Sequence, residues 1–171
     1  MTYQKSISRT LYANPRGVCL ATQSLNQTPS VGMTIAFTGS IAMKGTLHND
    51  ISFSSGSIVL PSGYWYYVDA STEFHCVTTY DPTAYAKTQW YQGGSAIGTE
   101  GVNGMQYAAK DAALFSADEK CLALIDATGG SVTLTLKLNS FSIFTGINST
   151  TESQYVYAGQ GRAIIMQLEA P

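Results

Sequence analysis

The most regular stretch of this 171-residue sequence is Ser131-Val132-Thr133-Leu134-Thr135-Leu136-Lys137-Leu138. Val or Leu occupies every second position, and Ser, Thr or Lys stands between them. Successive side chains of a β-strand point to opposite faces, so this alternation predicts a strand with one buried and one wet face. The shorter run Asp50-Ile51-Ser52-Phe53-Ser54 has the same pattern.

Working outward, further apolar runs bounded by Gly, Pro and Ser are predicted to be strands at 18–22, 34–38 (continued by 40–44 after Gly39), 57–60, 64–70, 85–91, 121–126, 153–157 and 163–168. The 64–70 run carries aromatic residues on both faces, which predicts a central strand or a subunit contact. Thr128-Gly129-Gly130 is predicted to be a hairpin turn, 93–104 a long surface loop, and Met105–Phe115 a short helix. Strands do not alternate with helices, so the pattern favours an antiparallel sandwich or barrel over a parallel α/β sheet.

Composition excludes several classes of protein. Charged residues make up only 12% of the chain, about half the usual share, and the formal net charge is −2. The basic residues are scattered rather than clustered, so we expect no nucleic-acid partner. The N-terminus lacks the apolar region of a signal peptide, and no apolar run is long enough for a membrane helix.

The residues that usually carry chemistry do not form a known motif. There is no phosphate loop, no dinucleotide fingerprint and no zinc-ligand spacing. His75 adjoins Cys76, but neighbouring side chains of a strand point to opposite faces, so the two are not expected to meet. Cys19, Cys76 and Cys121 are predicted to be reduced, buried thiols. We therefore expect a protein that is not an enzyme, with no catalytic residue, metal or cofactor.

The segment 56–68, which reads Gly-Ser-Ile-Val-Leu-Pro-Ser-Gly-Tyr-Trp-Tyr-Tyr-Val, resembles the tumour-necrosis-factor-like (complement-type) jelly roll. That family often has an apolar strand, then Pro-x-Gly-Tyr, then a strand of alternating aromatics. The resemblance extends over about residues 33–170. It implies an all-β, antiparallel jelly-roll β-sandwich that forms a homotrimer, and similar modules occur in bacteriophage fibre heads and capsid decoration proteins. The expected organisation is an extended N-terminal arm at 1–16 and a jelly-roll domain at 17–171.

These features predict a virion structural protein, a capsid decoration (cement) protein that binds the major capsid shell and is made in the host cytoplasm. The alternatives are a tail or fibre module that binds a receptor or glycan and, more weakly, a carbohydrate-active enzyme. The residues expected at the trimer interface are Tyr66, Tyr91, Tyr155 and Tyr157. The arm residues expected to contact the capsid are Tyr3, Lys5, Arg9, Tyr12 and Arg16. For the alternative of a glycan-binding module, the expected contact is Trp90, although packing or a subunit contact is the preferred role of that side chain.

Overall fold

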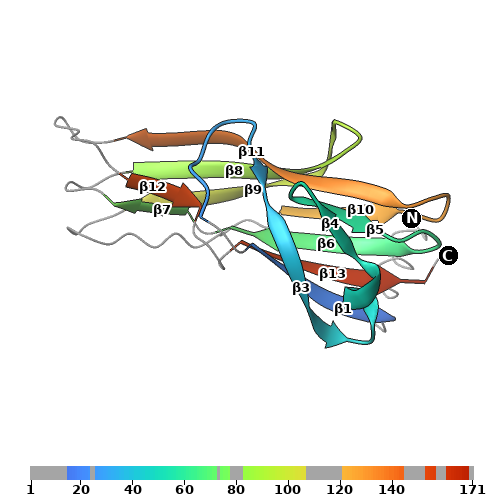
Figure 1. The fold of residues 1–171 in the computed structure, drawn as a ribbon. Helices are drawn as coiled ribbons and strands as arrows, with labels where there is room; N and C mark the ends of the chain where they lie inside the picture. Colours follow the sequence, from blue (N-terminus) through green and yellow to red (C-terminus); the bar gives the residue numbers. More distant parts are fainter. Residues whose placement is uncertain are drawn as a thin grey trace.

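The strand-forming segments build antiparallel sheets in the computed structural model of the chain (Figure 1). The structure describes residues 15–23, 26–72, 74–77, 83–106, 121–144, 153–156 and 161–169. Within these residues the chain is all-β, apart from the four-residue helix α2 (Leu47–Asp50). This confirms the all-β class and the antiparallel pairing expected from the alternating sequence.

The first sheet has five strands. Its order is β10 (Cys121–Asp126), β6 (Trp65–Ser71), β13 (Arg162–Leu168), β1 (Gly17–Gln23) and β3 (Phe37–Lys44). All four pairings are antiparallel. The prediction of a central strand at 64–70 is confirmed, since β6 lies between β10 and β13.

The second sheet has six strands. Its main path is β4 (Ser52–Ser54), β5 (Ser57–Leu60), β11 (Val132–Phe144), β8 (Thr83–Gln92) and β9 (Ser95–Gln106). The short β2 (Thr34–Ile35) pairs with β11 next to the segment that β5 occupies. The alternation at 131–138 is confirmed, because all four of its apolar side chains are buried. A separate two-stranded sheet joins β7 (Phe74–Val77) to β12 (Ser153–Val156).

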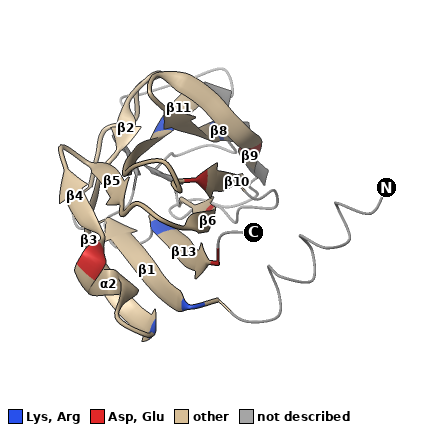
Figure 2. Cartoon of the chain, turned by 90° about the vertical axis from the view of Figure 1, so that its right-hand side faces the viewer, with Lys and Arg blue, Asp and Glu red and all other residues tan. Residues whose placement is uncertain are grey.

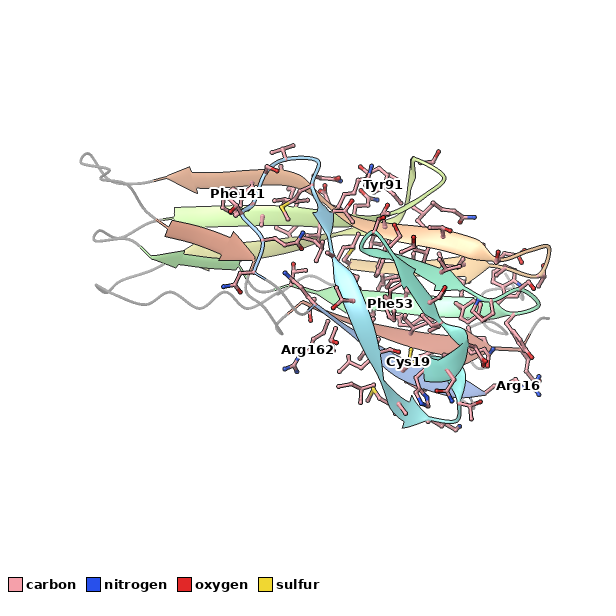
Figure 3. The ribbon with its side chains drawn as sticks, in the orientation of Figure 1. Arg16, Cys19, Phe53, Tyr91, Phe141 and Arg162 are labelled. Atoms are coloured by element: carbon pink, nitrogen blue, oxygen red, sulfur yellow. The ribbon has the colours of Figure 1, made fainter. Side chains whose placement is uncertain are left out.

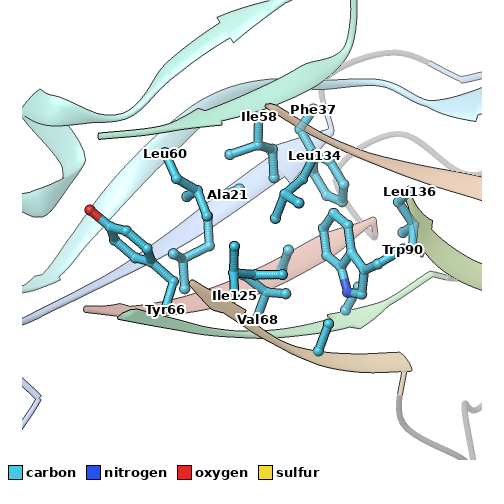
Figure 4. Close-up of a cluster of buried hydrophobic side chains, with 14 of the residues drawn as sticks. Ala21, Phe37, Ile58, Leu60, Tyr66, Val68, Trp90, Ile125, Leu134 and Leu136 are labelled. Atoms are coloured by element: carbon cyan, nitrogen blue, oxygen red, sulfur yellow. The ribbon is translucent and has the colours of Figure 1, made fainter. Parts of the chain in front are cut away.

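The hydrophobic core lies between the two large sheets (Figure 4). Trp90 on β8 has no exposed surface, and its ring stacks on that of Phe37 with the centroids 6.1 Å apart. The indole Nε1 of Trp90 donates a hydrogen bond of 3.1 Å to the backbone oxygen of Cys121 on the opposite sheet. This bond satisfies the polar atom of a buried indole and ties the two layers together.

The chain crosses repeatedly between the sheets. β5 belongs to the six-stranded sheet, β6 to the five-stranded sheet and β8 to the six-stranded sheet again, and β10, β11 and β13 alternate in the same way. The Thr128–Gly130 turn is present, and Asp126 Oδ1 accepts hydrogen bonds from both the backbone nitrogen and the hydroxyl of Thr128. The hairpin prediction is wrong, however, because this turn joins strands of different sheets. Turn residues specify a reversal of the chain but not the partner of the next strand.

The predicted surface loop at 93–104 is also wrong, because these residues form most of β9, which pairs with β8 through a tight turn at Gly93-Gly94. The glycines inside β9 allow it to lie against β10. A Cβ atom at Gly98, where φ is +68°, would sit on the backbone oxygen of Leu122, and one at Gly101 would lie 2.7 Å from Cys121 Cβ. Glycine within a strand often marks such a close approach of two backbones.

Other boundaries differ by a few residues. The strand runs through Gly39, and the break lies at Ala36, between β2 and β3. Asp50 ends α2 rather than beginning a strand. In the helix predicted at Met105–Phe115, the first two residues belong to β9, and the remainder lies outside the described residues.

Candidate functional site

The outer face of the five-stranded sheet is unusually apolar. Strands β1, β6, β10 and β13 point alternate side chains into the core, so the residues between them point outward. Register places the outward side chains in two rows across the sheet. The first row is Leu122, Asp69, Ile164, Leu20 and Ile41, and the second is Leu124, Tyr67, Met166, Val18 and Lys44. We call the eight uncharged residues of these rows the apolar face.

Several of these side chains are well exposed. Ile41 is 59% exposed and Leu124 is 39% exposed, at opposite edges of the sheet. Met43, the extra residue where the register shifts between β1 and β3, is 60% exposed. The other residues of the apolar face are half-buried. Contiguous apolar surface of this kind marks a contact with a partner more often than scattered apolar residues do.

The outer face of the six-stranded sheet has the opposite character. There Lys87 and Glu100 form a 3.1 Å ion pair, and Asn139 Nδ2 donates to Glu100 Oε1 and Gln89 Oε1. Tyr91 donates a 2.8 Å hydrogen bond to Asn139 Oδ1. A hydrogen bond from Asn139 has the largest effect on the pKa of the Glu100 carboxyl group and lowers it. The hydrogen bond and the positive charge of Lys87 lower this pKa further. This face is suited to water, so the two sides of one sandwich differ in the surroundings they fit.

Figure 3 shows the two sides, with Tyr91 on the six-stranded sheet and Arg162 at the start of β13 in the five-stranded sheet. Charged residues are sparse over the described part of the chain (Figure 2). Within the two rows the charges are Asp69, on β6, and Lys44, at the free end of β3. An interface whose centre is poor in charge and rich in aliphatic groups is typical of stable subunit contacts.

The predicted role of Tyr66 at a trimer interface must be corrected. Its side chain has no exposed surface, and its hydroxyl donates a 2.9 Å hydrogen bond to the backbone oxygen of Pro61 inside the protein. Burial raises the pKa of this phenol. The neighbouring Tyr67 points outward instead and lies on the apolar face. A shift of one position along a strand moves a side chain to the other face, and sequence alternation alone did not distinguish the two tyrosines.

The other predicted interface tyrosines have different outcomes. Tyr91 is half-buried within the polar network, and Lys137 Nζ lies 4.8 Å from the centroid of its ring. Tyr155 lies on β12, opposite His75, and its side chain is not among those described. Tyr157 lies outside the described residues. The interface role of these three tyrosines stays a prediction.

Trp90 cannot be a glycan contact in this structure, because its ring is sealed in the core between Phe37 and Cys121. The packing role is the correct one. Trp90 and Tyr91 are neighbours in a strand, so one of the two rings is expected to be buried and the other to point outward. The sequence pattern does not show which of them is buried.

Most of the predicted capsid contacts cannot be located in the structure. Tyr3, Lys5, Arg9 and Tyr12 are outside the described residues. Arg16 is exposed, and its backbone nitrogen donates a 2.9 Å hydrogen bond to the backbone oxygen of Gln167. The chain is therefore tied to the five-stranded sheet from Arg16 onward, one residue before the predicted start of the domain.

The described thiols are poor nucleophiles. Cys19 and Cys121 are free and buried, and burial raises the pKa of Cys19 to about 12 and that of Cys121 to about 11. Both remain protonated near neutral pH and pack as small apolar groups. The part of the chain that the structure describes contains no group of three or more His, Cys, Asp or Glu residues suited to a metal ion.

Comparison with known proteins gives no relative: no family model matches the chain, and no curated protein matches it. No helix among the described residues is both long enough and apolar enough to cross a bilayer. The site must therefore be interpreted from its own geometry.

Proposed function

We propose that this chain is a virion structural protein, a homotrimeric capsid decoration (cement) protein that binds and stabilises the major capsid shell. The observation that carries the proposal is the apolar face of the five-stranded sheet. Its central residues, Leu20, Ile164 and Met166, lie on neighbouring interior strands and would remain partly in water in a monomer. Burying them against a second copy removes this cost.

The chain path supports the finer fold assignment, a tumour-necrosis-factor-like jelly roll. Two facing antiparallel sheets with strands that cross alternately between them are what a jelly roll requires. The segment 56–68, which carries the resemblance, spans β5, the turn after it and the first part of β6. Three copies arranged around an axis meet through heterologous contacts, in which one part of the apolar face packs on a different part of the next copy.

The arm supplies the second contact in this proposal. Arg16, from which the chain is tied to the five-stranded sheet, lies at one end of the sandwich (Figure 3). In this proposal residues 1–16 bind the capsid, and the apolar face serves self-association. Ordering such a segment on a neighbouring surface has an entropic cost, which the new contacts must exceed.

The test separates the two contacts. Purified full-length protein is analysed by light scattering, and a variant that lacks residues 2–14 is compared with it. We expect both to be trimers, because the truncation keeps the hydrogen bond from Arg16 to Gln167. Only the full-length protein should cosediment with capsids of the virus that encodes it. The proposal is refuted if the full-length protein is monomeric at micromolar concentration or is absent from purified particles.

A further inference from the structure

A cavity of about 560 Å³ opens at one end of the sandwich, where β1 begins. Its walls come from the start of β1, the turn before α2, α2 itself and the turn between β5 and β6. Figure 3 places Arg16 at this end of the molecule, and Figure 2 looks onto the same end, with α2 beside β1. The volume lies within the range of small-molecule sites, roughly 300–1,000 Å³.

Two glycines allow the segments of this wall to pack closely. A Cβ atom at Gly17 would lie 2.7 Å from Leu47 Cβ, a distance that real side chains essentially never reach. A Cβ atom at Gly45 would lie 3.1 Å from the backbone oxygen of Arg16, and Gly45 also has a φ of +67°, which favours glycine. The cavity is thus bounded by backbone and apolar side chains that lie close to one another.

The polar groups of the wall are held in place. Tyr66 donates its hydroxyl to Pro61 O at 2.9 Å, and Gln167 Nε2 lies 3.5 Å from that hydroxyl as a donor. These bonds orient the Gln167 amide in the cavity wall. The guanidinium of Arg16 lies 5.6 Å from the centroid of the Tyr64 ring, a cation–π distance that steadies both side chains.

The lining has a mixed character that restricts the ligand. Tyr64 offers part of an aromatic ring, and Arg16, Asp50 and Gln167 offer planar donors and acceptors. One cationic and one anionic side chain leave the cavity without a net charge, which disfavours a strongly charged ligand. A sugar ring has apolar C–H groups on its faces and hydroxyls around its edge that both donate and accept. We propose that this cavity binds an uncharged saccharide unit.

The polar network on the other sheet is a weaker candidate for the same ligand. There the carboxylate of Glu100 is already engaged by Lys87 and Asn139. A ligand would have to break these contacts before forming its own. The site therefore differs from the one predicted from the sequence: Trp90 is buried, and the half-buried Tyr64 lines the cavity.

The test uses the full-length protein and needs no capsid, so its result is independent of the decoration proposal. The protein is screened on an array of neutral and acidic oligosaccharides. The best neutral unit is then titrated by ¹H–¹⁵N NMR. We expect shifts at the backbone amides of Gly17, Gly45 and Thr46. Tyr64→Ala and Asp50→Ala should each weaken binding by at least about tenfold, as for the loss of one strong contact.

Tyr91→Ala is the matched control, since it removes a tyrosine from the opposite face, and it should leave affinity unchanged. Asp50 is exposed, so Asp50→Ala tests the cavity even if Tyr64→Ala does not fold. The proposal is overturned if no neutral saccharide binds, if only acidic glycans bind, or if both cavity variants retain wild-type affinity.

Discussion

Replacing Leu20 by lysine should dissociate the trimer while leaving the monomer folded. Leu20 lies in the apolar face on β1, with Ile164 and Ile41 as its cross-strand neighbours, so no acidic side chain is directly opposite. In the monomer a lysine stem lies along the sheet and its ammonium reaches water, so the free energy of unfolding should change by about 1 kcal/mol or less.

At a subunit contact the same change is far more costly. Each copy loses about 1 kcal/mol of apolar burial, because Leu20 is already half-buried in the monomer. Leaving an ammonium group unpaired in the contact adds roughly 3 kcal/mol. The sum of about 4 kcal/mol for each contact corresponds to roughly a thousand-fold loss of affinity.

Light scattering after gel filtration measures this directly. We expect Leu20→Lys to run at the monomer mass of 18.3 kDa and the wild type at three times that mass. Thr133→Lys is the control, because Thr133 is exposed on the outer face of the other sheet. Thr133→Lys should keep the mass of the wild type, and circular dichroism should show that the Leu20→Lys monomer keeps a β-rich spectrum. If Leu20→Lys keeps the mass of the wild type, the apolar face is not the subunit contact.

Three further predictions concern the core. Trp90→Phe should lower the free energy of unfolding by about 2–3 kcal/mol, because it leaves a void and removes the hydrogen bond to Cys121 O. Urea titration measures this change. A loss below about 1 kcal/mol would contradict the packing described. Gly98→Ala should destabilise by more than about 2 kcal/mol in the same assay, since its Cβ would collide with β10, whereas Gly129→Ala, in open space, should be nearly neutral. In a background that lacks the third cysteine, Cys19 and Cys121 should resist alkylation at pH 8 until urea unfolds the protein. Folding raises the pKa of Cys19 from 9.0 to about 12 and that of Cys121 from 9.0 to about 11. The contribution of these thiols to the free energy of unfolding should therefore be complete below about pH 9 and decline as the pH rises toward 12. Rapid labelling of the native protein would refute this.

Much of the strand content followed from local pattern. The alternation at 131–138 predicted both the strand and its buried face, and the aromatic run at 64–70 predicted an interior strand. The same reasoning failed at 93–104, where glycines suggested a loop. Those glycines serve a close approach to β10, which is distant in sequence, so no local signal distinguished the two cases.

The candidate site was harder to predict. The sequence of β13, which is apolar at both alternate positions, did not distinguish the face that is buried in the core. It did not show that the other face, with Ile164 and Met166, lies on an apolar outer surface. The cavity at Tyr64 brings together segments near residues 16, 46, 64 and 167, which are joined only by the pairing of the sheets.

The sequence by itself determined the all-β class, the approximate position of most described strands and the low charge of the surface, because these depend on side-chain period and composition. Only the tertiary structure decided which strands pair, which of Tyr66 and Tyr67 is buried, and where an aromatic ring borders a cavity. Pairing joins residues as distant as Gly17 and Gln167. The free energy of such contacts depends on the whole chain, and the alternation within a single strand carries no information about its neighbours.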